Sequence, residues 1–381
     1  MARPVYLDYN ATTPTDPRVF EAMRRYALLD FGNPSSHHAH GRTAQLAVDE
    51  ARGWVAELLH AQPEEIVFTS GATESNNLLL LGLADHGRRT GRMHILASSI
   101  EHPSVLGPLA ALSRQGFDVE FLPVSGAGYV DPDEVRLRLG IDTLLVAIMH
   151  ANNETGVLQP VLEIAPLVAE SNALFHVDAA QTFGKEVQEL RALECDFLSI
   201  SGHKILGPKG VGALYVKRTG GKRAILSPII HGGGQETGLR PGTLPVPLIA
   251  GLGVAAELAL REHIDREKDA LRIRCEFQKY LASVDHLVNG DLGRMQSHVM
   301  NVSFPGVDSE ALMLVLRDSI AVSNGSACSA ASYRQSHVLA AMGLKADRIA
   351  SSVRFSWGPG VESVPFDRLM DAIRSLSGAT V

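Results

Sequence analysis

Short apolar runs alternate with amphipathic stretches over the first two thirds of the chain. Runs of strand length occur, among others, at residues 66–69, 94–98, 144–149, 174–177 and 197–200. Several of these runs are apolar on both faces, which is typical of parallel strands covered by helices on both sides. The stretch at residues 39–60 instead repeats its apolar residues at helical spacing. The alternation predicts an α/β fold with a mostly parallel central sheet flanked by helices.

The pattern changes after about residue 250. Longer helical stretches and isolated strands are expected there at residues 254–281, 299–304, 309–317, 353–357 and 365–376. This order predicts a smaller α+β domain after the large one, as the length of 381 residues allows. We place the large domain at residues 16–258. Residues 1–15 are expected to join residues 259–381 in the small domain.

Composition narrows the classes of protein. The formal charge of −7 argues against a chain that grips nucleic acid directly, because such surfaces carry a basic excess. Three cysteines, at positions 195, 275 and 328, exclude a disulfide framework and fit a reducing cytoplasm. No apolar stretch reaches the ~20 residues that span a bilayer. We therefore expect a cytoplasmic protein without membrane or direct nucleic-acid contacts.

Two polar residues follow apolar strands and suggest a cofactor. Lys204 ends the segment Ser201-Gly202-His203-Lys204, and Asp178 follows the strand at residues 174–177. Pyridoxal phosphate needs a lysine for covalent attachment and a carboxylate that keeps its pyridine nitrogen protonated. Lys204 and Asp178 suit these roles. Taken alone, Lys204 is equally a surface lysine in a polar turn, and Asp178 a helix N-cap.

Small residues follow the strand at residues 66–69, in Ser70-Gly71-Ala72-Thr73-Glu74. Free N–H groups at the start of the following helix, together with hydroxyl groups, predict a phosphate site there. The alternative is an ordinary capping box, with Ser70 or Thr73 as N-cap. A second glycine-rich segment, residues 231–243, is either a loop that crosses an interface or a plain flexible loop.

Two further residues are candidates for chemistry. His102 follows the strand at residues 94–98 and is flat enough to stack on an aromatic cofactor, although a loop histidine with satisfied hydrogen bonds is the alternative. Cys328 lies in Gly325-Ser326-Ala327-Cys328, a small polar loop in which an exposed thiol can act as a nucleophile. The alternative is that Cys328 is merely a small residue, equivalent to a serine. Cys195 and Cys275 are expected to be structural. The histidines at positions 37, 38 and 40 match no common zinc spacing, so we predict no metal site.

Taken together, these residues resemble the class I cysteine desulfurases of the nitrogenase and iron–sulfur assembly type. These are fold type I, aminotransferase class V enzymes that use pyridoxal phosphate. The similarity covers nearly the whole chain and rests on specific motifs. They are Ser70-Gly71-Ala72-Thr73-Glu74-Ser75-Asn76, His150-Ala151-Asn152-Asn153-Glu154-Thr155-Gly156, His176-Val177-Asp178, Ser201-Gly202-His203-Lys204 and Gly325-Ser326-Ala327-Cys328.

The resemblance implies a role for each site residue. Lys204 holds the cofactor covalently, Asp178 pairs with the pyridine nitrogen, Gln181 with the phenolic oxygen, and His102 stacks on the ring. The phosphate is contacted by Ala72, Thr73, Ser201 and His203, with Thr243 supplied by the partner subunit of a homodimer. Arg354, with Asn153 nearby, binds the carboxylate of L-cysteine. Cys328 attacks the substrate sulfur, and its loop is expected to be mobile. L-Alanine is released, and the persulfide on Cys328 passes to an acceptor.

The acceptor remains open. Housekeeping desulfurases usually continue into a tail that helps to dock the iron–sulfur scaffold, and this chain ends soon after its closing helix. We therefore weigh iron–sulfur cluster assembly against a specialised acceptor protein, such as one serving DNA phosphorothioation or tRNA thiolation. Two alternatives for the activity are a selenocysteine lyase or other class V enzyme, and a catalytically silent scaffold. Thr237 and Pro241 depart from the usual pattern of the inter-subunit loop.

Overall fold

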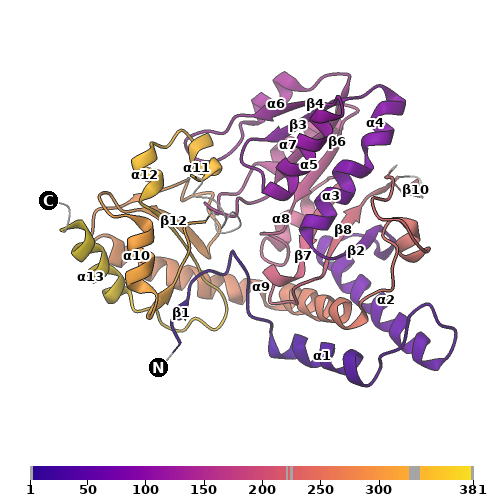
Figure 1. Ribbon diagram of the computed structural model, residues 1–381, viewed down its shortest axis with the longest axis horizontal. Coiled ribbons are helices and arrows are strands. Elements are labelled where there is room, and N and C mark those ends of the chain that lie inside the picture. Colours follow the sequence, from indigo (N-terminus) through magenta and orange to yellow (C-terminus); the bar gives the residue numbers. More distant parts are fainter. Residues whose placement is uncertain (1–2, 220–221, 224–225, 326–334, 379–381) are drawn as a thin grey trace.

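A seven-stranded sheet forms the larger lobe of the computed structural model, which describes residues 3–219, 222–223, 226–325 and 335–378 (Figure 1). Its strands are β2 (Ile66–Thr69), β3 (His94–Ser98), β4 (Asp118–Leu122), β5 (Thr143–Met149), β6 (Leu174–Asp178), β7 (Phe197–Ser201) and β8 (Gly212–Val216). The spatial order is β2-β8-β7-β6-β5-β3-β4. Strand β8 is antiparallel to both neighbours, and the remaining pairs are parallel. The predicted α/β class is confirmed.

Helices cover both faces of this sheet. They are α1 (Pro17–Leu28), α2 (Ala39–Leu59), α3 (Ala72–Gly82), α4 (Ala84–Thr90), α5 (Pro103–Arg114), α6 (Pro132–Arg138), α7 (Val161–Ala169), α8 (Val187–Ala192) and α9 (Val246–Leu281). Successive strand residues alternate between two cores: Ile66 and Phe68 face α2 and α9, whereas Val67 faces α3 and α5. Burial on both faces explains why the strands are continuously apolar.

The smaller lobe carries a three-stranded antiparallel sheet and a short two-stranded one. The first contains β11 (Leu287–Val288), β12 (Val299–Ser303) and β14 (Ser352–Ser356), and the second pairs β1 (Val5–Tyr6) with β13 (Ile320–Ala321). Its helices are α10 (Ser309–Leu316), α11 (His337–Ala341), α12 (Ala346–Ala350) and α13 (Phe366–Ser377). Phe277, Phe355 and Phe366 meet in its core, with Phe277 stacked on Phe366 at 4.9 Å between ring centroids.

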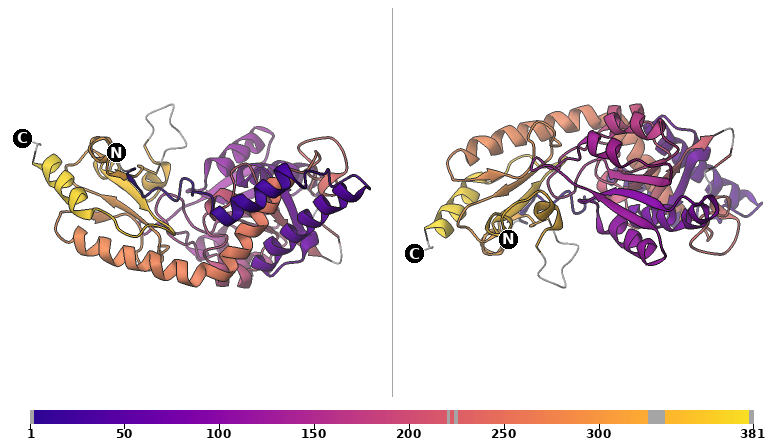
Figure 2. Two further views of the ribbon diagram at one scale, coloured as in Figure 1. Left: turned by 90° about the horizontal axis from the view of Figure 1, so that it is seen from below. Right: turned by 90° about the horizontal axis from the view of Figure 1, so that it is seen from above.

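Helix α9 runs along one side of both lobes (Figure 2). Its first half, up to Ala259, packs in the core of the large lobe, and its second half, from Ala270, in that of the small lobe. The change of core lies within the helix, and the exact domain boundary after residue 258 stays a prediction. The helix begins at Val246, eight residues earlier than predicted, because proline is tolerated in the first turn, where its missing N–H is not needed.

Three short 3₁₀ turns and a small hairpin complete the architecture of the residues that the structure describes. They are η1 (Pro63–Glu65), η2 (Gly202–Lys204) and η3 (Gln235–Gly238), with the hairpin formed by β9 (Arg218–Thr219) and β10 (Lys222–Arg223). Within the described ranges, no helix has the length and apolar character needed to cross a membrane. The parallel strands β5, β6 and β7 end at one edge of the sheet, which is where ligands bind in folds of this class.

Candidate active site

A cavity of about 580 Å³ opens at this edge of the sheet, between the two lobes. It is lined by the predicted site residues Ala72, Thr73, His102, Asn153, Asp178, Gln181, Ser201, His203, Lys204 and Arg354. Residues from five strand ends or helix starts and from the small lobe therefore meet in one place. The roles given to them above are predictions that this proximity does not test.

The start of α3 faces the cavity without a side-chain cap. Gly71 is the N-cap residue, its φ of 147° is one that favours glycine, and no side chain bonds to the first N–H groups. The alternative of a capping box with Ser70 or Thr73 as N-cap is therefore wrong. The N–H groups of the first turn are left for a ligand, and the positive end of the helix dipole favours an anion.

Asp178 is fixed by two hydrogen bonds at the end of β6. Its Oδ1 accepts from the N–H of Ala180 at 2.9 Å, and its Oδ2 accepts from Nδ2 of Asn76 at 2.8 Å. Asn76 lies on α3 and also donates to Oγ of Ser104 at 2.9 Å. The carboxylate is 5% exposed, so its orientation is set by these donors.

The same network reaches His102, the N-cap of α5. Its Nδ1 accepts from the N–H of Ser104 at 3.1 Å and lies 2.8 Å from that residue's hydroxyl. A backbone N–H can only donate, so the neutral ring carries its proton on Nε2. Burial lowers the pKa of His102, the Lys204 charge lowers it further, and Asp178 opposes both. A neutral ring is therefore favoured at this wall of the cavity.

Lys204 ends the 3₁₀ turn that follows β7. Its Nζ donates to the carbonyl oxygen of Asn10 and, at 2.9 Å, to that of Ala11. The Asn10 carbonyl also accepts from Nε2 of Gln181 at 3.0 Å. Next to Lys204, His203 lies 3.1 Å from the Thr12 hydroxyl, and burial followed by the Lys204 charge lowers its pKa to about 4. The N-terminal segment thus closes one side of the cavity.

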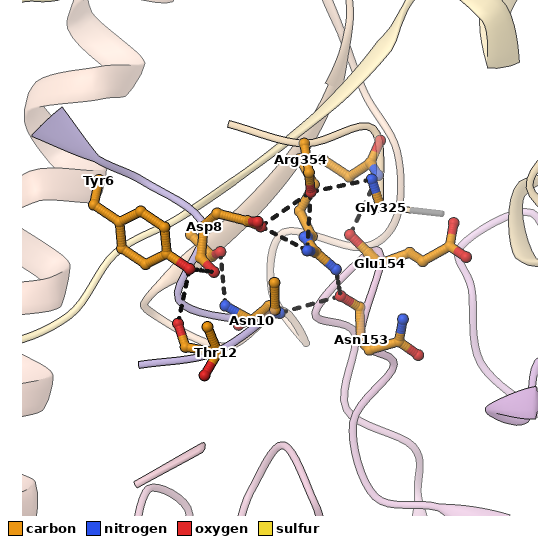
Figure 3. Close-up of polar contacts among 12 residues, drawn as sticks. Tyr6, Asp8, Asn10, Thr12, Asn153, Glu154, Gly325 and Arg354 are labelled. Carbon is orange, nitrogen blue, oxygen red and sulfur yellow. Dashed lines mark hydrogen bonds and ion pairs between the residues drawn. The ribbon is translucent and has the colours of Figure 1, made fainter. Parts of the chain in front are cut away.

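Arg354 of β14 also lines the cavity and belongs to the polar cluster of Figure 3. It donates from Nη1 to the Asn153 carbonyl at 2.8 Å, and from Nη2 to Asp8 Oδ1 at 2.7 Å and Ser323 Oγ at 2.9 Å. The side chain of Arg354 is 3% exposed, and its Nε is buried without a partner in the described part of the chain. A carboxylate entering the cavity meets a guanidinium that is already oriented and still has N–H groups to donate.

Four other residues were also interpreted from the sequence: Cys328, Thr243, Cys195 and Cys275. Cys328 lies outside the described residues, so its position and the expected mobility of its loop stay predictions. Thr243 is exposed and does not line the cavity of its own chain. Cys195 is buried, and burial raises the pKa of its thiol, as expected of a structural cysteine. Cys275 is exposed on α9, so the expectation that it is a packed structural residue is wrong; it lies on the solvent side of the helix.

Some residues with clear positions in the site were not singled out from the sequence. Asn10, 1% exposed, bonds through its side chain to the Asn153 carbonyl, and through its own carbonyl to Lys204 and Gln181. Asp8 holds Arg354, and Asn76 holds Asp178. These partners lie up to 346 residues apart in sequence, so only the folded chain brings them together. The histidine at position 38 caps α2 through Nδ1, which accounts for one member of the 37–40 cluster.

Comparison with known proteins identifies the family. Residues 5–363 match the model of the aminotransferase class V family. The cysteine desulfurase IscS of Vibrio cholerae is 44% identical over 98% of this chain and 93% of its own. Among solved structures, DndA from Streptomyces lividans is 46% identical, with a TM-score of 0.82 over 92% of this chain and 98% of its own. A structure of SspA in complex with cysteine is 39% identical, with a TM-score of 0.82 over 93% and 99%.

The chain belongs to the aminotransferase class V family, and within it to the cysteine desulfurases, which depend on pyridoxal 5′-phosphate and act on L-cysteine. The cavity fits that cofactor. The uncapped start of α3 suits a phosphate, Asp178 suits a pyridinium nitrogen, and Lys204 suits covalent attachment. Gln181 Oε1, buried and without a partner in the described residues, adds a polar group at the cavity wall.

Proposed function

We propose that Lys204 both attaches the cofactor and, once freed as an amine, removes the α-proton of L-cysteine. The supporting observation is that Lys204, Asp178 and Arg354 line one cavity. The cofactor, when bound, supplies the electron sink for the carbanion. Ala72, Thr73, Ser201 and His203 hold its phosphate, His102 covers its ring, and Gln181 bonds to its phenolic oxygen.

Arg354 binds the substrate carboxylate and so orients the α-proton toward Lys204. Asn153 contributes through its carbonyl, which holds one edge of the guanidinium at 2.8 Å. The buried ion pair with Asp8 keeps the guanidinium in place between turnovers. A substrate carboxylate shares this arginine with Asp8, whose side chain is 17% exposed.

Sulfur removal is assigned to Cys328. Its thiolate attacks the substrate Sγ; an S–S bond forms while the Cβ–Sγ bond breaks, and the bonding electrons return to the substrate carbon, which is protonated and leaves as L-alanine. The reaction is balanced without an external oxidant, because the Cys328 thiol becomes a persulfide. The flanking residue Gly325 lines the cavity and donates its N–H to Ser323 Oγ at 3.3 Å, beside Arg354.

We further propose a homodimer. Five large apolar side chains are exposed together on α1, α2 and the loop between them: Phe20, Leu28, Leu29, Phe31 and Leu46, each at least 59% exposed. An apolar surface of this kind is typical of a subunit interface. Thr243, exposed on the glycine-rich loop, is assigned to the phosphate site of the partner.

The sulfur acceptor is proposed to be a separate protein in the cytoplasm. Sequence identity does not distinguish between the possible pathways of the acceptor, since the chain is 44% identical to an IscS and 46% identical to a DndA. A net charge of −7 supports delivery through a protein rather than direct contact with nucleic acid.

The assignment of Cys328 is tested with three serine variants. Cys328→Ser is expected to keep the visible absorbance of the bound cofactor and its change on adding L-cysteine, but to lose alanine release. Cys195→Ser and Cys275→Ser should retain activity. Mass spectrometry after incubation with L-cysteine should find the extra sulfur atom on the peptide containing Cys328. Alanine release by Cys328→Ser together with its loss in another variant would identify a different nucleophile.

A further inference from the structure

Lys204 also borders a second cavity, here called the rear cavity. This rear cavity has a volume of about 70 Å³, enough to admit water. Lys204 is the residue that lines both cavities. The rear cavity brings a second lysine, Lys185, and a histidine, His298, close to the first lysine.

Lys185 is placed there by the turn between β6 and α8, and its amine points to a histidine. Its Nζ lies 3.2 Å from Nε2 of His298. Among the described residues, no carboxylate lies within ion-pair distance of the Lys185 amine. The adjacent Glu186 instead accepts a hydrogen bond from Nε2 of Gln296 at 3.0 Å. A lysine with a neutral partner in a poorly solvated site is easily deprotonated.

One ring nitrogen of His298 lies within hydrogen-bond distance of two partners. Its Nε2 lies 3.2 Å from Lys185 Nζ and also 3.2 Å from Oδ1 of Asn10. The nitrogen holds either a proton or a lone pair. When Lys185 is charged, it donates to the lone pair, and Asn10 Oδ1 loses its donor. When Lys185 is neutral, the Nε2–H is free to donate to Asn10. The charge on Lys185 is therefore linked to the residue whose carbonyl holds Lys204.

We propose that Lys185, acting through His298 and Asn10, controls whether the Lys204 amine carries a proton. Lys185 is a positioning residue, because it lines the rear cavity and not the cofactor site. The inference rests on the proposed role of Lys204, which must alternate between a neutral amine and an ammonium. Two nearby amines repel each other's protons, and the coupling is reciprocal.

The electrostatics of the rear cavity support this coupling. Burial, followed by the Lys204 charge, lowers the pKa of Lys185 to about 7, and Glu186 opposes both. His298 is neutral, since burial and then Lys185 lower its pKa well below its usual range. The other charged or titratable residues that line the two cavities are Tyr9, His102, Asp178, Glu186, His203, Lys209, His263, Arg266, Glu267 and Arg354. Glu267 is exposed, and Arg266 is paired with Glu262 at 2.8 Å.

The test measures how fast the cofactor-free full-length protein takes up pyridoxal phosphate at each pH, followed by absorbance. Uptake requires a neutral Lys204 amine. Below about pH 6, Lys185 of the wild type is charged and favours the neutral form of Lys204. Cofactor uptake by the wild type should therefore be about tenfold faster than uptake by Lys185→Met, which corresponds to a difference of about one unit in the pKa of Lys204. Above about pH 8 the two rates should converge, because Lys185 is then neutral. Because the free cofactor titrates identically in both measurements, its titration cancels from the ratio of the two uptake rates.

Two further variants sharpen the result. Lys185→Arg, with a permanent charge, should exceed the wild-type rate above about pH 8. Lys268→Met, at an exposed lysine of α9 paired with Asp265, should match the wild type throughout. The inference would be overturned if the ratio of the wild-type uptake rate to that of Lys185→Met did not change with pH. This holds both for a ratio of one and for a constant slowing of the variant, because a purely structural role of Lys185 would not follow its titration. Borohydride trapping and peptide mapping separate this failure from that of the proposed function: labelling of a lysine other than Lys204 contradicts the latter.

Discussion

The two halves of the active site are built in different ways. The cofactor half, comprising Thr73, Asp178, Ser201 and Lys204, is placed at or next to strand ends or a helix start of one sheet, so the backbone sets the position of each residue. The substrate half, comprising Asp8, Asn10, Asn153 and Arg354, joins segments from both lobes through side-chain contacts spanning 143 to 346 residues. The sheet places the residues of the first half, and the N-terminal segment then holds the Lys204 amine through the Asn10 and Ala11 carbonyls. The second half also needs the two lobes to meet.

This difference predicts different consequences of substitution. Changes in the cofactor half should alter cofactor binding or chemistry directly. Changes in the substrate half should leave the bound cofactor unchanged and alter the use of L-cysteine. Four substitutions test this division, in decreasing order of expected effect.

Lys204→Ala is expected to have the largest effect. It removes both the covalent attachment and the proposed base, so alanine production should fall by many powers of ten, each worth about 1.4 kcal/mol of activation free energy. The cofactor should still bind through its phosphate and ring contacts, with altered absorbance. Steady-state alanine assays and spectra of the purified protein measure the two quantities. Turnover near the wild-type rate would remove Lys204 from the mechanism.

Arg354→Lys should weaken substrate binding by about 10- to 100-fold in kcat/KM, because one charge-assisted, geometrically matched contact is worth ~1.5–3 kcal/mol. The cofactor spectrum without substrate should not change, since Arg354 belongs to the substrate half. Arg272→Lys, at an exposed arginine of α9, is the matched control. If Arg354→Lys instead released the cofactor, the two halves would not be separable.

Asn76→Ala should weaken cofactor binding by about tenfold or more, because Asp178 and Ser104 both lose a hydrogen bond and bonds to charged groups contribute ~1.5–3 kcal/mol. Its neighbour Asn77 offers a close control, since it is only half-buried and its side chain bonds within its own helix, to the Thr73 carbonyl at 2.8 Å. Cofactor dissociation constants of the two alanine variants provide the comparison. Equal values would mean that Asn76 does not support Asp178.

The same division explains how far the sequence predicts this molecule. The strands at residues 66–69 and 94–98 were predicted with their observed bounds, because an apolar run bounded by turn residues is a local signal. The residues of the cofactor half follow such runs and were found with them. Asp8 and Asn10 carry no local signal of their role, which depends on partners in another lobe. The start of α9 was predicted eight residues too late, because its first turn contains a proline, which is tolerated where the N–H is not needed.

The smallest expected effect concerns Glu101, where the two halves touch. Its side chain is fully buried beside the cofactor half, and its carbonyl lies 3.0 Å from Nε2 of His337, just after the Cys328 loop. Burial raises the pKa of Glu101 to about 8, although the Ser98 hydroxyl and the Met149 N–H oppose it. Below the unfolded pKa of about 4.5 both states are protonated. Between that value and about 8, the unfolded state loses a proton that the folded state keeps, so stability falls as pH rises.

Glu101→Gln removes this titration and serves as the reference. The free energy of unfolding of the wild type minus that of the variant should fall between about pH 5 and pH 8, by at most ~1.4 kcal/mol per pH unit for one proton. Chemical denaturation at each pH measures the difference, and any constant cost of burying the amide cancels from the slope. Activity at pH 7 should change little, because Glu101 does not line the cofactor cavity. A difference that stays level or rises with pH would show that the folded protein holds Glu101 ionised, and the seam between the two halves would then carry a buried negative charge beside Asp178.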